Sequence, residues 1–127
     1  MSTNTLTTSA LESRTVMSNR LVGFVAAWQT MIDCHAKANF KGLWDRALES
    51  GRDHYESVTI DEGKRFWKIV VETAYGQRSC RAFIDKETGA IYKAASWSAP
   101  AKHVRGYITA EDYGMSCMTQ YGPRYLR

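Results

Sequence analysis

The first third of the chain places its apolar residues at steps of three and four, which is the spacing of one helix face. Between residues 16 and 35 these positions are Leu21, Phe24, Val25, Trp28, Met31 and Ile32. A second run, with Asn39 as its cap and Gly51 as its stop, comprises Phe40, Leu43, Trp44, Ala47 and Leu48. The pattern predicts two helices whose tryptophans face the core.

Beyond residue 53 the period of the apolar positions changes to two, which is typical of strands. The clearest strand covers residues 65–75, where an apolar face alternates with a mixed one. Further strands are predicted over residues 54–60, 79–85 and 90–95. The turns between them, at Gly76 and at residues 85–89, are short. Short connections of this kind indicate an antiparallel meander.

These elements predict an α+β fold in which two N-terminal helices pack on a three- to four-stranded antiparallel meander. A short C-terminal tail, helical or irregular, completes a single domain over residues 15–127. Residues 1–14 are rich in Ser and Thr and carry almost no bulky apolar side chains. We expect a flexible arm there, because such a segment buries too little surface to offset its ordering entropy.

The meander is expected to stop at Pro100, because proline fixes its own backbone and keeps Ala99 out of the helical region. Residues 101–105 are then predicted to form one helical turn, closed by Gly106. The backbone amides at the start of that turn would favour an anion.

Composition narrows the class of protein. The chain has 127 residues, 44% of them hydrophobic and 24% charged, which fits a globular domain with one core. No apolar stretch approaches the roughly 20 residues that cross a bilayer, and the N-terminus lacks a secretory signal, so no membrane partner is expected. Cys34, Cys80 and Cys117 are odd in number and far apart. They favour a reduced, cytosolic setting over a disulfide framework.

Charge is spread unevenly along the chain. Residues 1–63 hold six Lys and Arg residues against eight Asp and Glu, whereas residues 64–105 hold nine against three. The formal net charge of +4 therefore arises in the middle of the chain. A local basic segment predicts an anion-binding face. A basic surface kept for solubility is the simpler alternative.

The candidate site lies in this basic segment, around Pro100. An exposed ring beside cations suits a nucleotide or a nucleic acid, because the ring stacks on a base while the cations hold phosphate. In the alternative interpretation, the tryptophan plugs the end of the core and the lysines extend from it to solvent. The predicted ligand-binding residues are Lys93, Trp97, Lys102, His103 and Arg105.

Residues 83–106 of this segment read FIDKETGAIYKAASWSAPAKHVRG. This block resembles one found in small, mostly uncharacterised proteins encoded by bacteriophages. The resemblance does not reach the predicted helices. It implies phage origin, and hence a role in the virion or in the infected cytoplasm.

Enzymatic chemistry is not indicated by the sequence. Cys34 and His35 are neighbours, but adjacent helix positions point about 100° apart, so they do not form a catalytic dyad. His35, His54 and His103 fall in different predicted elements, so no metal site is expected. No glycine-rich phosphate loop is present. We expect neither catalysis nor a cofactor.

Two functions remain open at this point. The first is a non-enzymatic accessory protein of phage infection that binds a nucleotide or nucleic acid in the host cytoplasm, in counter-defence or host takeover. The second is a virion structural or assembly protein that contacts other virion proteins through its N-terminal arm and C-terminal tail. A homo-oligomer is expected in either case, because a thin two-layer fold leaves sheet edges uncovered.

Overall fold

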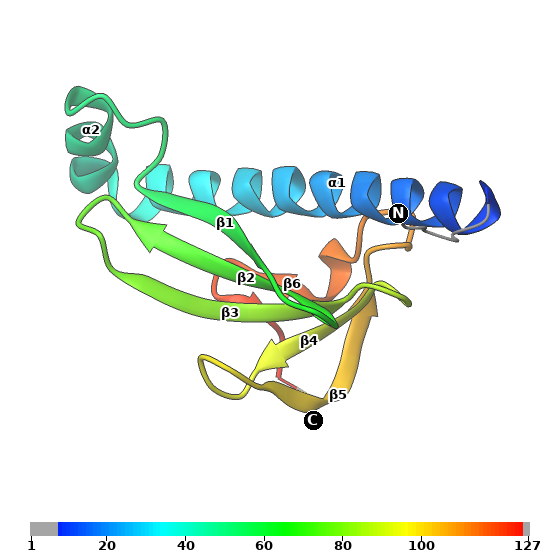
Figure 1. Ribbon diagram of the computed structural model, residues 1–127. Coiled ribbons are helices and arrows are strands. Elements are labelled where there is room, and N and C mark those ends of the chain that lie inside the picture. Colours follow the sequence, from blue (N-terminus) through cyan, green and yellow to red (C-terminus); the bar gives the residue numbers. More distant parts are fainter. Residues whose placement is uncertain (1–7, 126–127) are drawn as a thin grey trace.

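The computed structural model describes the backbone of residues 8–125 and the side chains of residues 15–125. Two helices precede a five-stranded antiparallel sheet, which confirms the predicted α+β class (Figure 1). The helices are α1 (Thr8–Asn39) and α2 (Lys41–Glu49). The strands lie side by side in chain order: β1 (Glu56–Glu62), β2 (Phe66–Thr73), β3 (Arg78–Asp85), β4 (Ala90–Ala94) and β5 (Pro100–Tyr107).

A C-terminal segment of short elements follows the sheet. It contains a 3-10 turn (Met115–Cys117) and a two-stranded pair, β6 (Met118–Thr119) with β7 (Gly122–Pro123). The segment packs beside α1 on one face of the five-stranded sheet, because Trp28 Nε1 of α1 donates a hydrogen bond to the Thr119 carbonyl at 2.8 Å. The 3-10 turn fits the helical or irregular tail that the sequence predicts, whereas the β6–β7 pair was not predicted.

Helix α1 carries the predicted apolar stripe toward the sheet. It starts earlier than expected, at Thr8, and so takes in residues 8–14 of the predicted arm, whereas residues 1–7 lie outside the described residues. Phe40, predicted inside the second helix, precedes α2 as its N-cap residue. Gly51 follows α2 with φ of 91°, as a helix-terminating glycine does.

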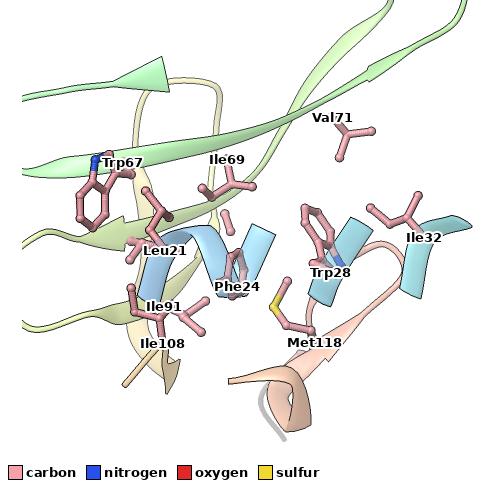
Figure 2. Packing of buried hydrophobic residues seen from close by; sticks show 12 residues of the cluster. Leu21, Phe24, Trp28, Ile32, Trp67, Ile69, Val71, Ile91, Ile108 and Met118 are labelled. Carbon is pink, nitrogen blue, oxygen red and sulfur yellow. The ribbon is translucent and has the colours of Figure 1, made fainter. Parts of the chain in front are cut away.

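The core forms between α1 and one face of the sheet (Figure 2). We call this the inner face and the opposite one the outer face. Trp28 and Phe24 of α1 have 0% exposure, and the strands meet them with alternate residues, as period two requires. The core residues beyond α1 are Trp67, Ile69, Val71, Ala82, Ile84, Ile91, Ile108 and Met118.

The helical turn predicted over residues 101–105 is wrong, because these residues belong to strand β5. Val104 pairs with Tyr92 and Pro100 pairs with Ala94, so β5 extends the meander to five strands. Pro100 fits here because it is the first residue of an edge strand, where a missing N–H donor is tolerated. The backbone amides of a helix N-terminus, which were expected to favour an anion, are therefore absent from residues 101–105.

Candidate anion-binding surfaces

The structure divides the predicted site residues between the two faces of the sheet. Lys93 pairs with Ala82, a core residue, and therefore lies on the inner face. Trp97 belongs to the loop between β4 and β5 and contacts Lys68 of β2, which pairs with Phe83 on the outer face. Lys93 and Trp97 are thus not brought together in one site.

Trp97 is held over the outer face by two cations. The Lys68 Nζ lies 4.4 Å from the centre of the indole ring, and the Arg78 guanidinium carbon lies 5.4 Å from it. The ring is nevertheless 45% exposed. It covers part of the outer face, outside the core cluster, rather than plugging the end of the core as in the alternative interpretation, and it leaves nearly half of its surface open to a partner.

A groove of about 280 Å³ lies beside this tryptophan, between the β1–β2 turn and the β4–β5 loop. Phe66 forms its floor with Phe83, and the two rings meet edge to face at 5.9 Å between centroids. Lys64 and Lys68 line the groove, and Ser98 of the loop closes one side. Phe66 and its lysines were not singled out from the sequence, because period two does not show which strand positions share a groove with a distant loop.

The carboxylates around the groove are already engaged by other cations. Asp61 accepts from Arg78 at 3.1 Å, and Asp85 accepts from Arg65 at 3.4 Å. Glu62 pairs with Lys86. Lys64 and Lys68, by contrast, have no carboxylate within salt-bridge distance among residues 15–125. The groove therefore keeps positive charge available for a ligand.

Lys102 and His103 are consecutive residues of the edge strand β5, so they point to opposite faces of the sheet and at most one of them lies on the face that carries Trp97. Both are exposed on β5, the last strand of the sheet. Neither side chain has a hydrogen-bonding or ionic partner within the described part of the chain. The side chains of Lys102 and His103 are accessible to a ligand, whereas those of Lys93 and Arg105 form hydrogen bonds within the protein.

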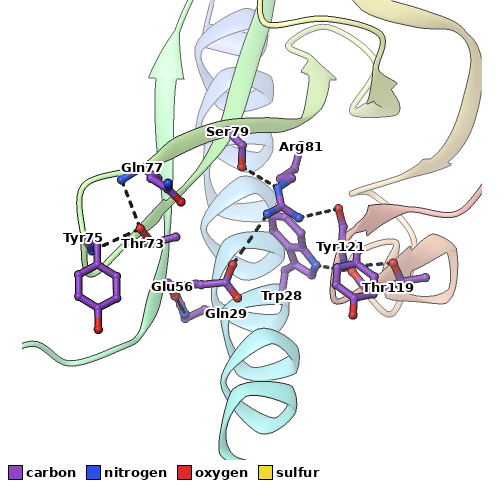
Figure 3. A network of polar contacts seen from close by, with 10 residues as sticks. All are labelled: Trp28, Gln29, Glu56, Thr73, Tyr75, Gln77, Ser79, Arg81, Thr119 and Tyr121. Carbon is purple, nitrogen blue, oxygen red and sulfur yellow. Dashed lines mark hydrogen bonds and ion pairs between the residues drawn. The ribbon is translucent and has the colours of Figure 1, made fainter. Parts of the chain in front are cut away.

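Lys93 and Arg105 hold the C-terminal segment instead. Lys93 Nζ donates to the Pro123 carbonyl at 3.1 Å, and Arg105 Nε donates to the Arg124 carbonyl at 3.1 Å. Arg81, which the sequence analysis did not identify, donates to the Tyr121 carbonyl at 3.0 Å (Figure 3). A register shift in the β2–β3 pairing leaves Arg81 without a partner residue in that ladder, and no sequence pattern marks such a bulge.

Burial lowers the pKa of Lys93, and the neighbouring guanidinium groups of Arg105 and Arg81 lower it further. Burial also raises the pKa of the Cys80 and Cys117 thiols, which disfavours the reactive thiolate.

Residues 15–125 contain no group of three or more His, Cys, Asp or Glu side chains placed to hold a metal ion. None of the described helices is long and apolar enough to span a membrane.

Comparison with known proteins identifies a family for this chain. A family model described as "Family of unknown function (DUF7717)" matches residues 7–123. The chain belongs to this family. The family's range includes both helices, the whole sheet and the groove beside Trp97. No curated protein and no solved structure matches the chain.

Proposed function

We propose that this protein is a non-enzymatic accessory protein of phage infection that binds single-stranded nucleic acid on the outer face of its sheet. The observation that carries the proposal is Trp97, 45% exposed and held 4.4 Å from Lys68 Nζ. Base stacking on such a ring tolerates any sequence, and adjacent lysines attract the phosphates.

The shape of the surface supports an extended strand over a single nucleotide. The groove beside Trp97 is open, and the Phe66 ring that lines it also contacts the Tyr92 ring of β4, with 5.9 Å between the two ring centroids. Successive rings on an exposed sheet face allow successive bases to stack. Lys64 and Lys68 then lie beside the path of the backbone, where they release counterions from it.

The phage setting rests on the resemblance of residues 83–106. This block covers the end of β3, all of β4, nearly all of β5 and the loop that carries Trp97. The proposed ring thus lies within the segment that resembles phage proteins, which supports a role in the infected host cytoplasm. Detection of the protein in infected cells and its absence from washed virions would support this setting.

Fluorescence anisotropy with a labelled oligothymidylate tests the binding. Trp97→Ala should raise Kd about fivefold to a hundredfold, because stacking is worth about 1–3 kcal/mol per base. Lys68→Met should weaken binding and reduce the slope of log K against log salt by about 1.

Two matched variants serve as controls for these changes. Tyr75→Ala removes a ring that is 66% exposed in the β2–β3 turn, and Lys41→Met removes a cation that pairs with Asp45 on α2. Both should bind like the wild type. The proposal fails if Trp97→Ala and Tyr75→Ala have equal affinities, or if the wild type shows no salt-sensitive retention of the oligonucleotide.

A second candidate function is a virion structural or assembly role through self-association. It is favoured by two apolar side chains on the outward side of α1, Val16 at 57% and Val22 at 65% exposure. Packing of α1 against a second copy would cover them. Light scattering should then give a mass above 14.4 kDa that Val22→Lys reduces to the monomer value. Recovery of the protein from washed virions would favour this role over the first.

A further inference from the structure

The C-terminal segment encloses a second pocket on the inner side of the sheet, away from Trp97. Its volume is about 450 Å³, which lies within the range of small-ligand sites. We call it the tail pocket. Lys93, Gln120, Tyr121, Arg124 and Tyr125 line it.

Positive charge exceeds negative charge around the tail pocket, as far as the described residues show. Lys93, Arg105 and Arg124 have no carboxylate within salt-bridge distance in the described residues, and Arg81 has Glu56 at 3.8 Å. These cations instead donate to backbone carbonyl groups of the tail. A carbonyl satisfies a hydrogen bond but does not neutralise a charge, so the pocket stays electropositive.

Two carboxylates, Glu56 and Asp112, lie near these four cations and offset only part of their charge. Asp112, which lies near Cys117, accepts from the backbone N–H groups of Gly114 and Ser116. Lys93 in turn has a lowered pKa because it is buried and close to two guanidinium groups. An anion in the pocket would offset the unfavourable interactions that lower this pKa.

Two rings give the pocket a second kind of contact. Tyr121 is 61% exposed and Tyr125 is 80% exposed, and Lys93 Nζ lies 4.1 Å from the Tyr125 ring centre. The Gln120 amide, which has no hydrogen-bond partner within the described residues, lies on the same wall. A planar base can stack on a tyrosine while the amide bonds its edge.

We infer that the tail pocket binds a phosphate monoester that carries a nucleobase, through its cations and tyrosines. This chemistry belongs both to a free mononucleotide and to the phosphorylated end of a nucleic acid strand. The site lies on the opposite face of the sheet from Trp97, so it does not depend on the groove proposed above for single-stranded nucleic acid.

Isothermal titration calorimetry with the full chain and adenosine 5′-monophosphate tests this inference. We expect one site per chain, at least about tenfold weaker in Lys93→Met because a charge-assisted hydrogen bond to phosphate is lost. Tyr125→Ala should weaken the mononucleotide but leave the affinity for inorganic phosphate unchanged. Trp97→Ala and Lys41→Met should bind as the wild type does.

Lys93 also holds the tail, so its variant requires a check on folding. If Lys93→Met lowers Tm markedly, the result for Tyr125→Ala decides, since that side chain is largely exposed and makes no hydrogen bond to any of the described residues. Oligonucleotides with and without a 5′-phosphate, added to Trp97→Ala, distinguish a strand end from a free nucleotide. Absence of mononucleotide binding, or equal binding by the wild type, Lys93→Met and Tyr125→Ala, would overturn the inference.

Discussion

Gly23 of α1 is the position where the absence of a side chain matters most for packing. A Cβ atom there would overlap the ring of Tyr113, a residue with φ of 59°. The same ring also contacts the Arg20 guanidinium, whose carbon lies 3.9 Å from the ring centre. At Gly42 of α2, in contrast, an added Cβ atom would meet no neighbouring atom within 4 Å.

The two glycines therefore predict opposite effects of one substitution. Gly23→Ala should lower the free energy of unfolding by about 1–3 kcal/mol, because the Tyr113 ring must move. Gly42→Ala should raise it by about 0.5–1 kcal/mol through helix propensity. Urea denaturation measures both values, and a stabilising Gly23→Ala would contradict the packing described.

Asp85 links charge to stability at the β3–β4 turn. Burial would raise the pKa of Asp85, but backbone N–H donors of Glu87 and Thr88 and the Arg65 guanidinium outweigh it, so the pKa lies below its usual value. The carboxylate form is thus favoured in the folded state. It contributes stability above the unfolded pKa of about 3.9, and this contribution is lost as pH falls through the folded value.

Asp85→Asn should destabilise the protein at pH 7, because the amide accepts the two backbone N–H groups more weakly and loses the Arg65 pair. The difference in unfolding free energy between wild type and variant should shrink as pH falls below about 4. Thermal unfolding from pH 7 to pH 2 measures this difference. A difference that stays constant over that range would show that the carboxylate charge is not responsible.

At the scale of elements, helix α1 meets the edge strand β1 through one amide side chain. Gln29 Oε1 accepts from the Val58 backbone N–H at 2.8 Å, and its Nε2 donates to the Glu56 carbonyl at 2.8 Å. These contacts reproduce what a neighbouring strand would supply.

Gln29→Ala should therefore cost about 1–3 kcal/mol of stability, because it leaves two partly buried backbone groups unpaired. Thr30→Ala, at the next position, removes an exposed hydroxyl bonded within the helix and should change stability by less than about 0.5 kcal/mol. Urea denaturation of the pair separates the bridging role from a general effect on the helix. Equal losses of stability in Gln29→Ala and Thr30→Ala would contradict the bridging role of Gln29.

The elements also show where prediction from sequence succeeds. The apolar stripe of α1 and the alternation in β2 are predictable because each repeats its period over many residues. Strand β5 is not, since Pro100 removes a donor and interrupts the pattern just where the chain returns to the sheet edge. The local sequence correctly marks Pro100 as a break in the strand pattern. It does not show that the residues after Pro100 pair with the open edge of β4.

At the scale of the whole molecule, the basic segment contributes to two separate cationic surfaces, one on each face of the sheet, rather than to a single one. The sequence places Lys93 and Trp97 four positions apart, and only the β4–β5 pairing separates them onto opposite faces. Arg124 and Tyr125 reach Lys93 from the far end of the chain, so neither charge patterning nor spacing links them to it. The double variant, Trp97→Ala with Lys93→Met, should therefore bind oligothymidylate as weakly as Trp97→Ala alone and adenosine 5′-monophosphate as weakly as Lys93→Met alone, when anisotropy and calorimetry measure the two affinities.

The Gln29 bridge also bears on how this sheet can grow. By occupying the Glu56 carbonyl and the Val58 N–H, it obstructs an incoming strand over residues 56–58 of that border. At the other border, among the described residues, β5 has no strand beside it. A sheet that can add a strand at only one edge pairs with one other copy and forms a dimer. A sheet that is open at both edges can instead form a filament. Self-association by strand addition would thus end at a closed pair.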